Sequence, residues 1–195
     1  MTVTVSTNHG FGRIWTIDDL VDTPDDGNRY EIADGSLLVS PAPSVSHGNV
    51  NDRIGDILRR QAPPGLRVLT VGIGIDIHRR RTYYIPDLLI TTEEALAAPD
   101  AANLHPADVL LVAEVLSPGN AGKDLVQKRH DYAAAGIPRY WIVDPRERTV
   151  TVLALPDAAT GYERAAVVTG RWATDVPYPL TIDPADIFSP RPASG

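Results

Sequence analysis

Two carboxylates interrupt segments of the chain that are otherwise apolar. Glu114 lies in the run VLLVAEVL at 109–116, and Asp87 lies in the run YIPDLLI at 84–90. Burying an unpaired carboxylate costs several kcal/mol, so each acid needs a cation or a metal ion beside it. Two like charges held close together repel unless a cation lies between them. A divalent metal ion shared by Asp87 and Glu114 would meet both needs.

Each acid also has a structural interpretation. Glu114 could form an ion pair with an arginine near the end of its strand, and Asp87 could cap a helix that begins near Thr91. If a metal ion is bound, its type is restricted because the chain contains no cysteine. Oxygen or histidine ligands remain, and these favour a hard cation such as Mg²⁺ or Mn²⁺.

Lysine is rare in this chain. Only Lys123 and Lys128 occur, and every other basic residue is an arginine. Lys128 falls in a helix predicted over 122–135, directly after the Glu114 strand, so its side chain could reach back toward the strand end. There it would orient a water molecule or balance the charge of a phosphate. The alternative is a solvated lysine paired with Asp124 four residues earlier on the same helix face.

The elements that must position these residues predict one α/β (α+β) domain over 15–190, with flexible tails at 1–14 and 191–195. A hairpin is expected over 30–39, because Asp34-Gly35 is a strong hairpin turn signal. A long helix is expected from Ser44 or Ser46 to Gln61, and short helices after Thr16, after Thr91 and over 183–188. Strands are expected over 66–71, 72–78, 84–90, 108–116, 139–143, 149–155 and 162–168. This order predicts a mixed sheet core flanked by helices.

Charge and hydropathy limit the classes of function. The net charge of −7 argues against a general nucleic-acid coat but leaves room for a local basic groove. Arg79, Arg80 and Arg81 form a predicted turn before the Asp87 strand and could contact phosphates, or they could be a solvated turn. The N-terminal residues lack a secretory signal pattern, and no apolar run is long enough to span a bilayer. A cytoplasmic protein without membrane contact is expected.

An ordered set of short motifs resembles the Uma-two family, whose members are described as endonucleases with a restriction-endonuclease-like fold in the PD-(D/E)xK nuclease superfamily. The resemblance spans about 15–190. It is carried by YEIADG at 30–35, SPAPS at 40–44, His47, PDL at 86–88, EVLSP at 114–118, Lys128 and GIPRYWIVD at 136–144.

The resemblance implies a role for several positions. Asp87 matches the PD motif and would be a metal ligand, Glu114 would be the second ligand, and Glu31 would complete the metal shell. The superfamily's usual lysine stands two residues after the second acid, where this chain has Leu116, so the resemblance implies that Lys128 replaces it. Apart from the resemblance, His47 opens the long helix near the hairpin that carries Glu31, so it could act as a proton carrier or contact nucleic acid, or else be a surface or capping histidine.

These observations favour a DNA endonuclease that uses Mg²⁺ or Mn²⁺ to hydrolyse phosphodiester bonds, with Glu31, Asp87, Glu114 and Lys128 as its catalytic set. Two alternatives are a catalytically silent nucleic-acid-binding or assembly module of the same fold, and a hydrolase of another phosphodiester. A homodimer would allow two sites to cut two strands. In all metal-dependent cases Asp87 and Glu114 should lie on adjacent strands, with carboxylates within about 6 Å of each other.

Overall fold

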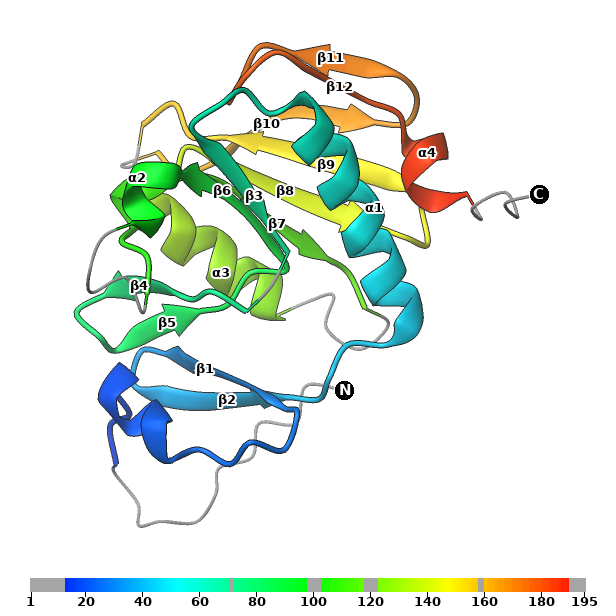
Figure 1. Cartoon of the computed structure of the whole chain (residues 1–195). Coiled ribbons are helices and arrows are strands. Elements are labelled where there is room, and N and C mark those ends of the chain that lie inside the picture. The colour runs from blue at the N-terminus through cyan, green and yellow to red at the C-terminus, as the bar shows by residue number, and fades with distance from the viewer. Residues whose placement is uncertain (1–12, 71, 98–102, 118–122, 158–159, 190–195) are drawn as a thin grey trace.

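The computed structural model describes residues 13–70, 72–97, 103–117, 123–157 and 160–189. Its strands form three sheets, with the orders β2-β1-β5-β4, β10-β9-β8-β7-β6-β3 and β11-β12. Figure 1 shows the four-stranded sheet at the lower left, beside the larger six-stranded sheet. The elements are η1 (Ile17–Asp22), β1 (Arg29–Ala33), β2 (Ser36–Ser40), α1 (Val45–Gln61), β3 (Leu66–Leu69), β4 (Ile75–His78), β5 (Thr82–Tyr84), β6 (Leu88–Thr92), α2 (Glu93–Leu96), η2 (Pro106–Asp108), β7 (Val109–Val115), α3 (Lys123–Ala134), β8 (Arg139–Asp144), β9 (Thr149–Ala154), β10 (Glu163–Val168), β11 (Trp172–Thr174), β12 (Leu180–Ile182) and α4 (Pro184–Phe188).

Two helices cover opposite faces of the six-stranded sheet. On one face, Ile54 and Leu58 of α1 belong to the same apolar cluster as every second residue of β7, namely Leu111, Ala113 and Val115. On the other face, Tyr132 of α3 packs with Val112. This division follows from the period of two in a strand, which sends neighbouring residues to opposite faces. Glu114 therefore projects to the same face as Val112, toward α3.

The register of β6 and β7 brings the two predicted acids opposite each other. These strands are antiparallel, and Leu88 pairs with Ala113. One position further along the same register stand Asp87, directly before β6, and Glu114 in β7. The two acids therefore lie on neighbouring segments, as the sequence predicted.

The segment at 85–87 corrects one prediction. A single strand was expected over 84–90, but the structure divides it into β5, in the four-stranded sheet, and β6, in the six-stranded sheet. Pro86 has no N–H to donate to a ladder, so it interrupts strand pairing. The chain crosses from one sheet to the other at this point, and Asp87 lies at the crossing.

Other element boundaries differ more modestly from the prediction. The long helix begins after Ser44, whose hydroxyl accepts a hydrogen bond from the backbone N–H of His47. The cap of α2 is Thr92, whose hydroxyl accepts a hydrogen bond from the backbone N–H of Ala95, and not Thr91, whose hydroxyl donates to the carbonyl of Asp108. The strand expected over 72–78 begins only at Ile75, and the hairpin of β11 and β12 was not predicted. The tails predicted over 1–14 and 191–195 lie almost wholly outside the described residues.

No helix in the described ranges is long and apolar enough to cross a membrane.

The packing of Gly74, directly before β4, against Tyr83 of β5 leads to a first prediction. A Cβ added at Gly74 would lie 2.0 Å from the ring of Tyr83, whereas a Cβ added at Gly72 would meet nothing within 4 Å. Because Tyr83 is buried, Gly74→Ala should destabilise the protein by ~1–3 kcal/mol, the usual cost of overpacking. Urea denaturation measures the loss, and Gly72→Ala is the matched control. Equal stability of the two variants would contradict this packing.

Candidate active site

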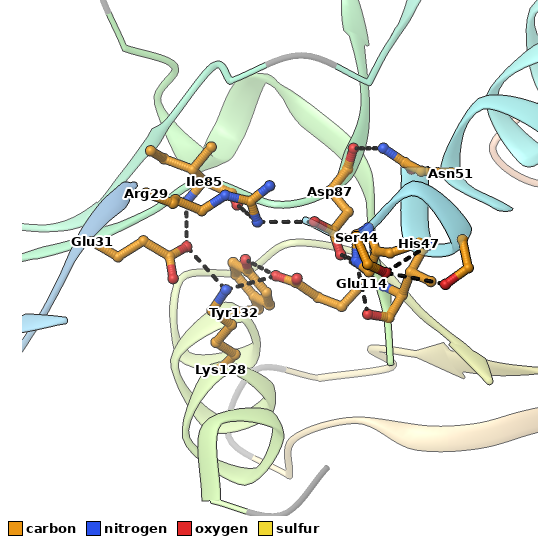
Figure 2. A network of polar contacts seen from close by, with 12 residues as sticks. Arg29, Glu31, Ser44, His47, Asn51, Ile85, Asp87, Glu114, Lys128 and Tyr132 are labelled. Atoms are coloured by element: carbon orange, nitrogen blue, oxygen red, sulfur yellow. Dashed lines mark hydrogen bonds and ion pairs between the residues drawn. The ribbon is translucent and has the colours of Figure 1, made fainter. Parts of the chain in front are cut away.

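Asp87 is the carboxylate of the site with the most hydrogen-bond and ion-pair partners. Its Oδ1 accepts a hydrogen bond from Nη1 of Arg29 at 2.9 Å. Its Oδ2 accepts one from the backbone N–H of Val115 at 2.9 Å and lies 3.1 Å from Nε2 of His47. The side-chain amide of Asn51 holds the backbone carbonyl of Asp87 at 2.8 Å. Figure 2 shows Arg29 of β1 and His47 and Asn51 of α1 around Asp87, and the N–H of Val115 comes from β7, so Asp87 is fixed by three elements.

A second cluster surrounds Lys128. Its Nζ donates to Oε1 of Glu31 and to Oε1 of Glu114, each at 3.0 Å. The hydroxyl of Tyr132, one helical turn further along α3, also donates to Oε1 of Glu114 at 3.0 Å. Oε1 of Glu31 in turn accepts a hydrogen bond from the backbone N–H of Ile85 at 2.7 Å. All the charged groups of this cluster are buried, so each depends on its partners for charge balance.

The two clusters differ in how their acids titrate. Burial alone would raise the pKa of Asp87, but the hydrogen bond to His47 and the charge of Arg29 outweigh it and lower this pKa to about 2. Burial raises the pKa of Glu114 to about 7, against the opposing charge of Lys128. Burial would also lower the pKa of Lys128, but the charges of Glu114 and Glu31 hold it above its ordinary value. One lysine between two carboxylates leaves a net negative charge, so a proton on Glu114 neutralises the cluster.

The structure brings Glu31, His47, Asp87, Glu114 and Lys128 into one region, in two neighbouring clusters of ion pairs and hydrogen bonds. Lys128 is buried against two carboxylates, and among the described residues Glu114 forms its ion pair with this lysine and with no arginine. Asp87 does not cap α2, whose cap is Thr92. The side chain of His47 is only 12% exposed and contacts Asp87, so it is not a surface histidine.

The arginine triplet is not brought to this region. Arg29 opens β1 and pairs with Ser40, whereas Ala33 pairs with Ser36 at the opposite end of the hairpin. The triplet lies beside that opposite end, because the backbone of Gly35 donates to the carbonyl of Arg81. Arg80 forms an ion pair with Asp18, and Arg81 lies 3.7 Å from Asp34. The contact of Arg79, Arg80 and Arg81 with flanking phosphates therefore stays a prediction.

Sequence reasoning missed Arg29, Asn51 and Tyr132. Arg29 stands two residues before Glu31, and alternation in a strand places residues i and i+2 on one face, so this signal was available. Asn51 and Tyr132 each lie four residues after a named residue on the same helix, His47 and Lys128. Helical spacing therefore pointed to both.

The oxygens of the site fit a hard divalent metal ion in their chemistry. Nε2 of His47 lies 3.1 Å from Oδ2 of Asp87 and 3.2 Å from the carbonyl oxygen of Val115, so these two oxygens lie near each other, while Oδ1 of Asp87 contacts Arg29. Oε2 of Glu114 accepts no hydrogen bond from any residue in the described ranges. Oxygen donors of this kind suit Mg²⁺ or Mn²⁺. No three His, Asp or Glu side chains among the described residues converge as a ready-made metal site. Instead, Arg29 contacts the carboxylate of Asp87, and Lys128 contacts those of Glu31 and Glu114.

The raised pKa values of Glu114 and His47 predict how stability depends on pH without metal. Each group binds its proton more tightly in the folded state, so each contributes stability at low pH that is lost as pH rises through its folded pKa. The free energy of unfolding in EDTA should therefore fall between about pH 5 and 8, by ~3 kcal/mol for Glu114 at 1.36 kcal/mol per pH unit. Chemical denaturation across this range tests it.

Glu114→Gln is the matched variant for this titration. Glutamine keeps the shape of the side chain and still accepts hydrogen bonds from Lys128 and Tyr132, but it has no proton to lose. The fall in stability should be smaller in this variant, with His47 supplying the remainder. Stability that increases from pH 5 to 8 in the wild type would contradict the assignment.

Comparison with known proteins places this arrangement in a family. A solved structure described as a "putative nuclease belonging to DUF820", from Anabaena variabilis ATCC 29413, superposes with a TM-score of 0.69 at 18% sequence identity, covering 90% of this chain and 98% of that chain. This likeness confirms the predicted mixed α+β, restriction-endonuclease-like fold. A search of curated protein sequences finds no match. The sequence model of the family Uma2, described as "Putative restriction endonuclease", matches residues 17–183. That range contains every residue of the site, and the chain belongs to the Uma2 (Uma-two) family.

Proposed function

We propose that this protein is a DNA endonuclease that uses Mg²⁺ or Mn²⁺ to hydrolyse phosphodiester bonds. The observation that carries the proposal is the position of Lys128, whose Nζ lies 3.0 Å from Oε1 of Glu114. In the superfamily pattern a lysine accompanies the second acid from two residues later, and here that residue is Leu116. A lysine supplied by α3 meets the same acid, which is how a working site would compensate. Membership of the Uma2 family and the likeness to the Anabaena variabilis protein support a nuclease.

Asp87, Glu114 and the carbonyl of Val115 would hold the metal ion. The ion, when bound, polarises the scissile phosphate and lowers the pKa of a water molecule for in-line attack. Lys128 would hold that water or the charge that develops on the phosphate. Glu31 was predicted as a third ligand, and its contact with Nζ of Lys128 adds a second role, because it fixes the direction of the ammonium group. Tyr132 fixes the carboxylate of Glu114 in the same way.

A catalytically silent nucleic-acid-binding module of the same fold is the second candidate. Its supporting observation is that Arg29, His47 and Lys128 already neutralise the acids. A closed network of this kind can persist for structural reasons alone. The two candidates differ in whether the protein cleaves DNA. In the endonuclease, metal binding and cleavage depend on the same carboxylates.

The first test concerns the metal. Asp87→Asn should abolish binding of Mn²⁺, because the amide carries no charge and offers one weak oxygen where the carboxylate offers two. Isothermal calorimetry measures binding, and thermal unfolding checks that the variant is folded. Asp56→Asn is the matched control, since Asp56 lies on α1 in an exposed ion pair with Arg59. Equal binding by wild type and Asp87→Asn would contradict the ligand role.

The second test concerns Lys128. Lys128→Met keeps the length of the side chain and removes the charge, so it should retain metal binding while cleavage falls ~10²–10⁴-fold, the usual range for a proton-transfer or positioning group. Conversion of supercoiled plasmid to nicked and linear forms with Mn²⁺ measures the rate. The surface variant Arg67→Met, which removes an exposed ion pair with Glu93, should cut like the wild type.

The outcomes of the plasmid assay separate the candidates. Normal cleavage by Lys128→Met together with none by Asp87→Asn would overturn the assignment of the lysine. Absence of cleavage by the wild type on single-stranded, duplex and supercoiled DNA, with intact metal binding, would favour the silent module.

A further inference from the structure

Arg29 and Lys128 are the two permanently charged cations of the site, and of these Arg29 is the more open to solvent. Its side chain is 27% exposed, whereas that of Lys128 is 10% exposed. All its hydrogen bonds to described residues come from Nη1, at 2.9 Å to Oδ1 of Asp87 and 3.2 Å to the carbonyl of Ile85. The donors on Nη2 and Nε are therefore free of protein partners in the described part of the chain. A guanidinium with one nitrogen on the protein and two available has the fork geometry that binds a phosphate.

We propose that Arg29 is an exchangeable counterion that couples the binding of a nucleic-acid phosphate to the binding of a divalent metal ion. This inference rests on the proposed function. In the absence of nucleic acid Arg29 occupies Oδ1 of Asp87. A phosphodiester that enters the site draws the guanidinium onto its own oxygens, and Oδ1 becomes available to the metal ion.

Competition between Arg29 and the metal ion follows from the oxygens they share. A metal ion requires an oxygen at about 2.0–2.5 Å, closer than the guanidinium nitrogen now stands. Oδ2 already accepts the backbone N–H of Val115 and contacts His47, so Oδ1 is the less crowded oxygen apart from Arg29. A divalent ion beside a guanidinium also repels it. Removing the guanidinium from Oδ1 therefore favours the metal ion twice, by freeing the oxygen and by removing a positive charge.

Lys128 cannot act as this exchangeable group. Its Nζ is held between two buried carboxylates and lies 5.2 Å over the ring of Tyr84. Leaving that position would expose two like charges to each other with no cation between them. Arg29 has one carboxylate partner and a path to solvent, so its movement costs less. The site thus contains one fixed cation and one that can leave.

Binding of Mn²⁺ in the presence and absence of DNA tests the coupling. Mn²⁺ is titrated into the full chain alone and with a saturating phosphorothioate DNA duplex, and free Mn²⁺ is followed by electron paramagnetic resonance. A titration of the duplex alone corrects for ions that it binds. Wild type should bind Mn²⁺ about tenfold more tightly with the duplex, within the range usual for coupled sites.

The variant Arg29→Gln should change both halves of this result. Without DNA it should bind Mn²⁺ several-fold more tightly than the wild type, because the competing cation is gone, and the duplex should then add less than about twofold. Arg67→Gln, which changes an exposed arginine of β3, should keep the wild-type coupling. Arg29→Lys keeps the charge with a poorer phosphate geometry and should give an intermediate coupling, which guards against a folding defect in the glutamine variant.

Two outcomes overturn the proposal. One is weaker Mn²⁺ binding by Arg29→Gln than by wild type in the absence of DNA, with the fold intact. The other is the same DNA coupling in Arg29→Gln and wild type. Neither outcome depends on cleavage, so failure of the endonuclease assay with coupling intact would count against the proposed function and leave the exchange in place.

Discussion

The ammonium group of Lys128 between Glu31 and Glu114 is the interaction on which this site depends. Three charged side chains from β1, β7 and α3 are buried together, and none could remain buried and charged without the others. Their mutual contacts tie the four-stranded sheet to the six-stranded sheet and to the helix that covers it. The position of α3 therefore follows from electrostatics as well as from its apolar face.

A second layer of contacts surrounds this triad and sets the chemistry of its neighbours. Asp87 is held ionised by His47 and Arg29, with its pKa lowered to about 2, while burial raises the pKa of Glu114 to about 7. The two neighbouring carboxylates thus titrate in different pH ranges. Environments that separate the pKa values of paired acids are typical of sites that handle protons or bind cations.

Much of the fold was predictable because its signals are local. The cap at Ser44, the Asp34-Gly35 turn and the apolar run around Glu114 each specify an element from a few residues, and the structure has α1, the hairpin of β1 with β2, and β7 at those places. The break at Pro86 was missed because the apolar residues on both sides of it satisfy the pattern of one strand. Which sheet each half joins depends on pairing with β1 and β7, distant in the sequence.

The site was predictable in its members but not in its connections. Asp87, Glu114 and Lys128 are exceptions within their surroundings, acids in apolar runs and one of two lysines, so composition alone singled them out. Arg29 was missed because arginine is common in this chain and its partner Asp87 is 58 positions away. The same distance explains why the contacts of Arg80 and Arg81 with Asp18 and Asp34 could not be foreseen.

The sequence separation of the two carboxylates that contact Lys128 also bears on how the molecule folds. Glu114 and Lys128 are 14 positions apart and meet within a single β–α–β unit, whereas Glu31 and Lys128 are 97 positions apart. Contacts between distant parts of a chain carry a larger entropic cost and form later than local ones. A chain in which only β7, α3 and β8 have assembled holds one carboxylate on the lysine and lacks the strand that carries Arg29. The complete set of charges exists only once both sheets have docked, so the chemistry of the site is itself a marker of finished tertiary structure.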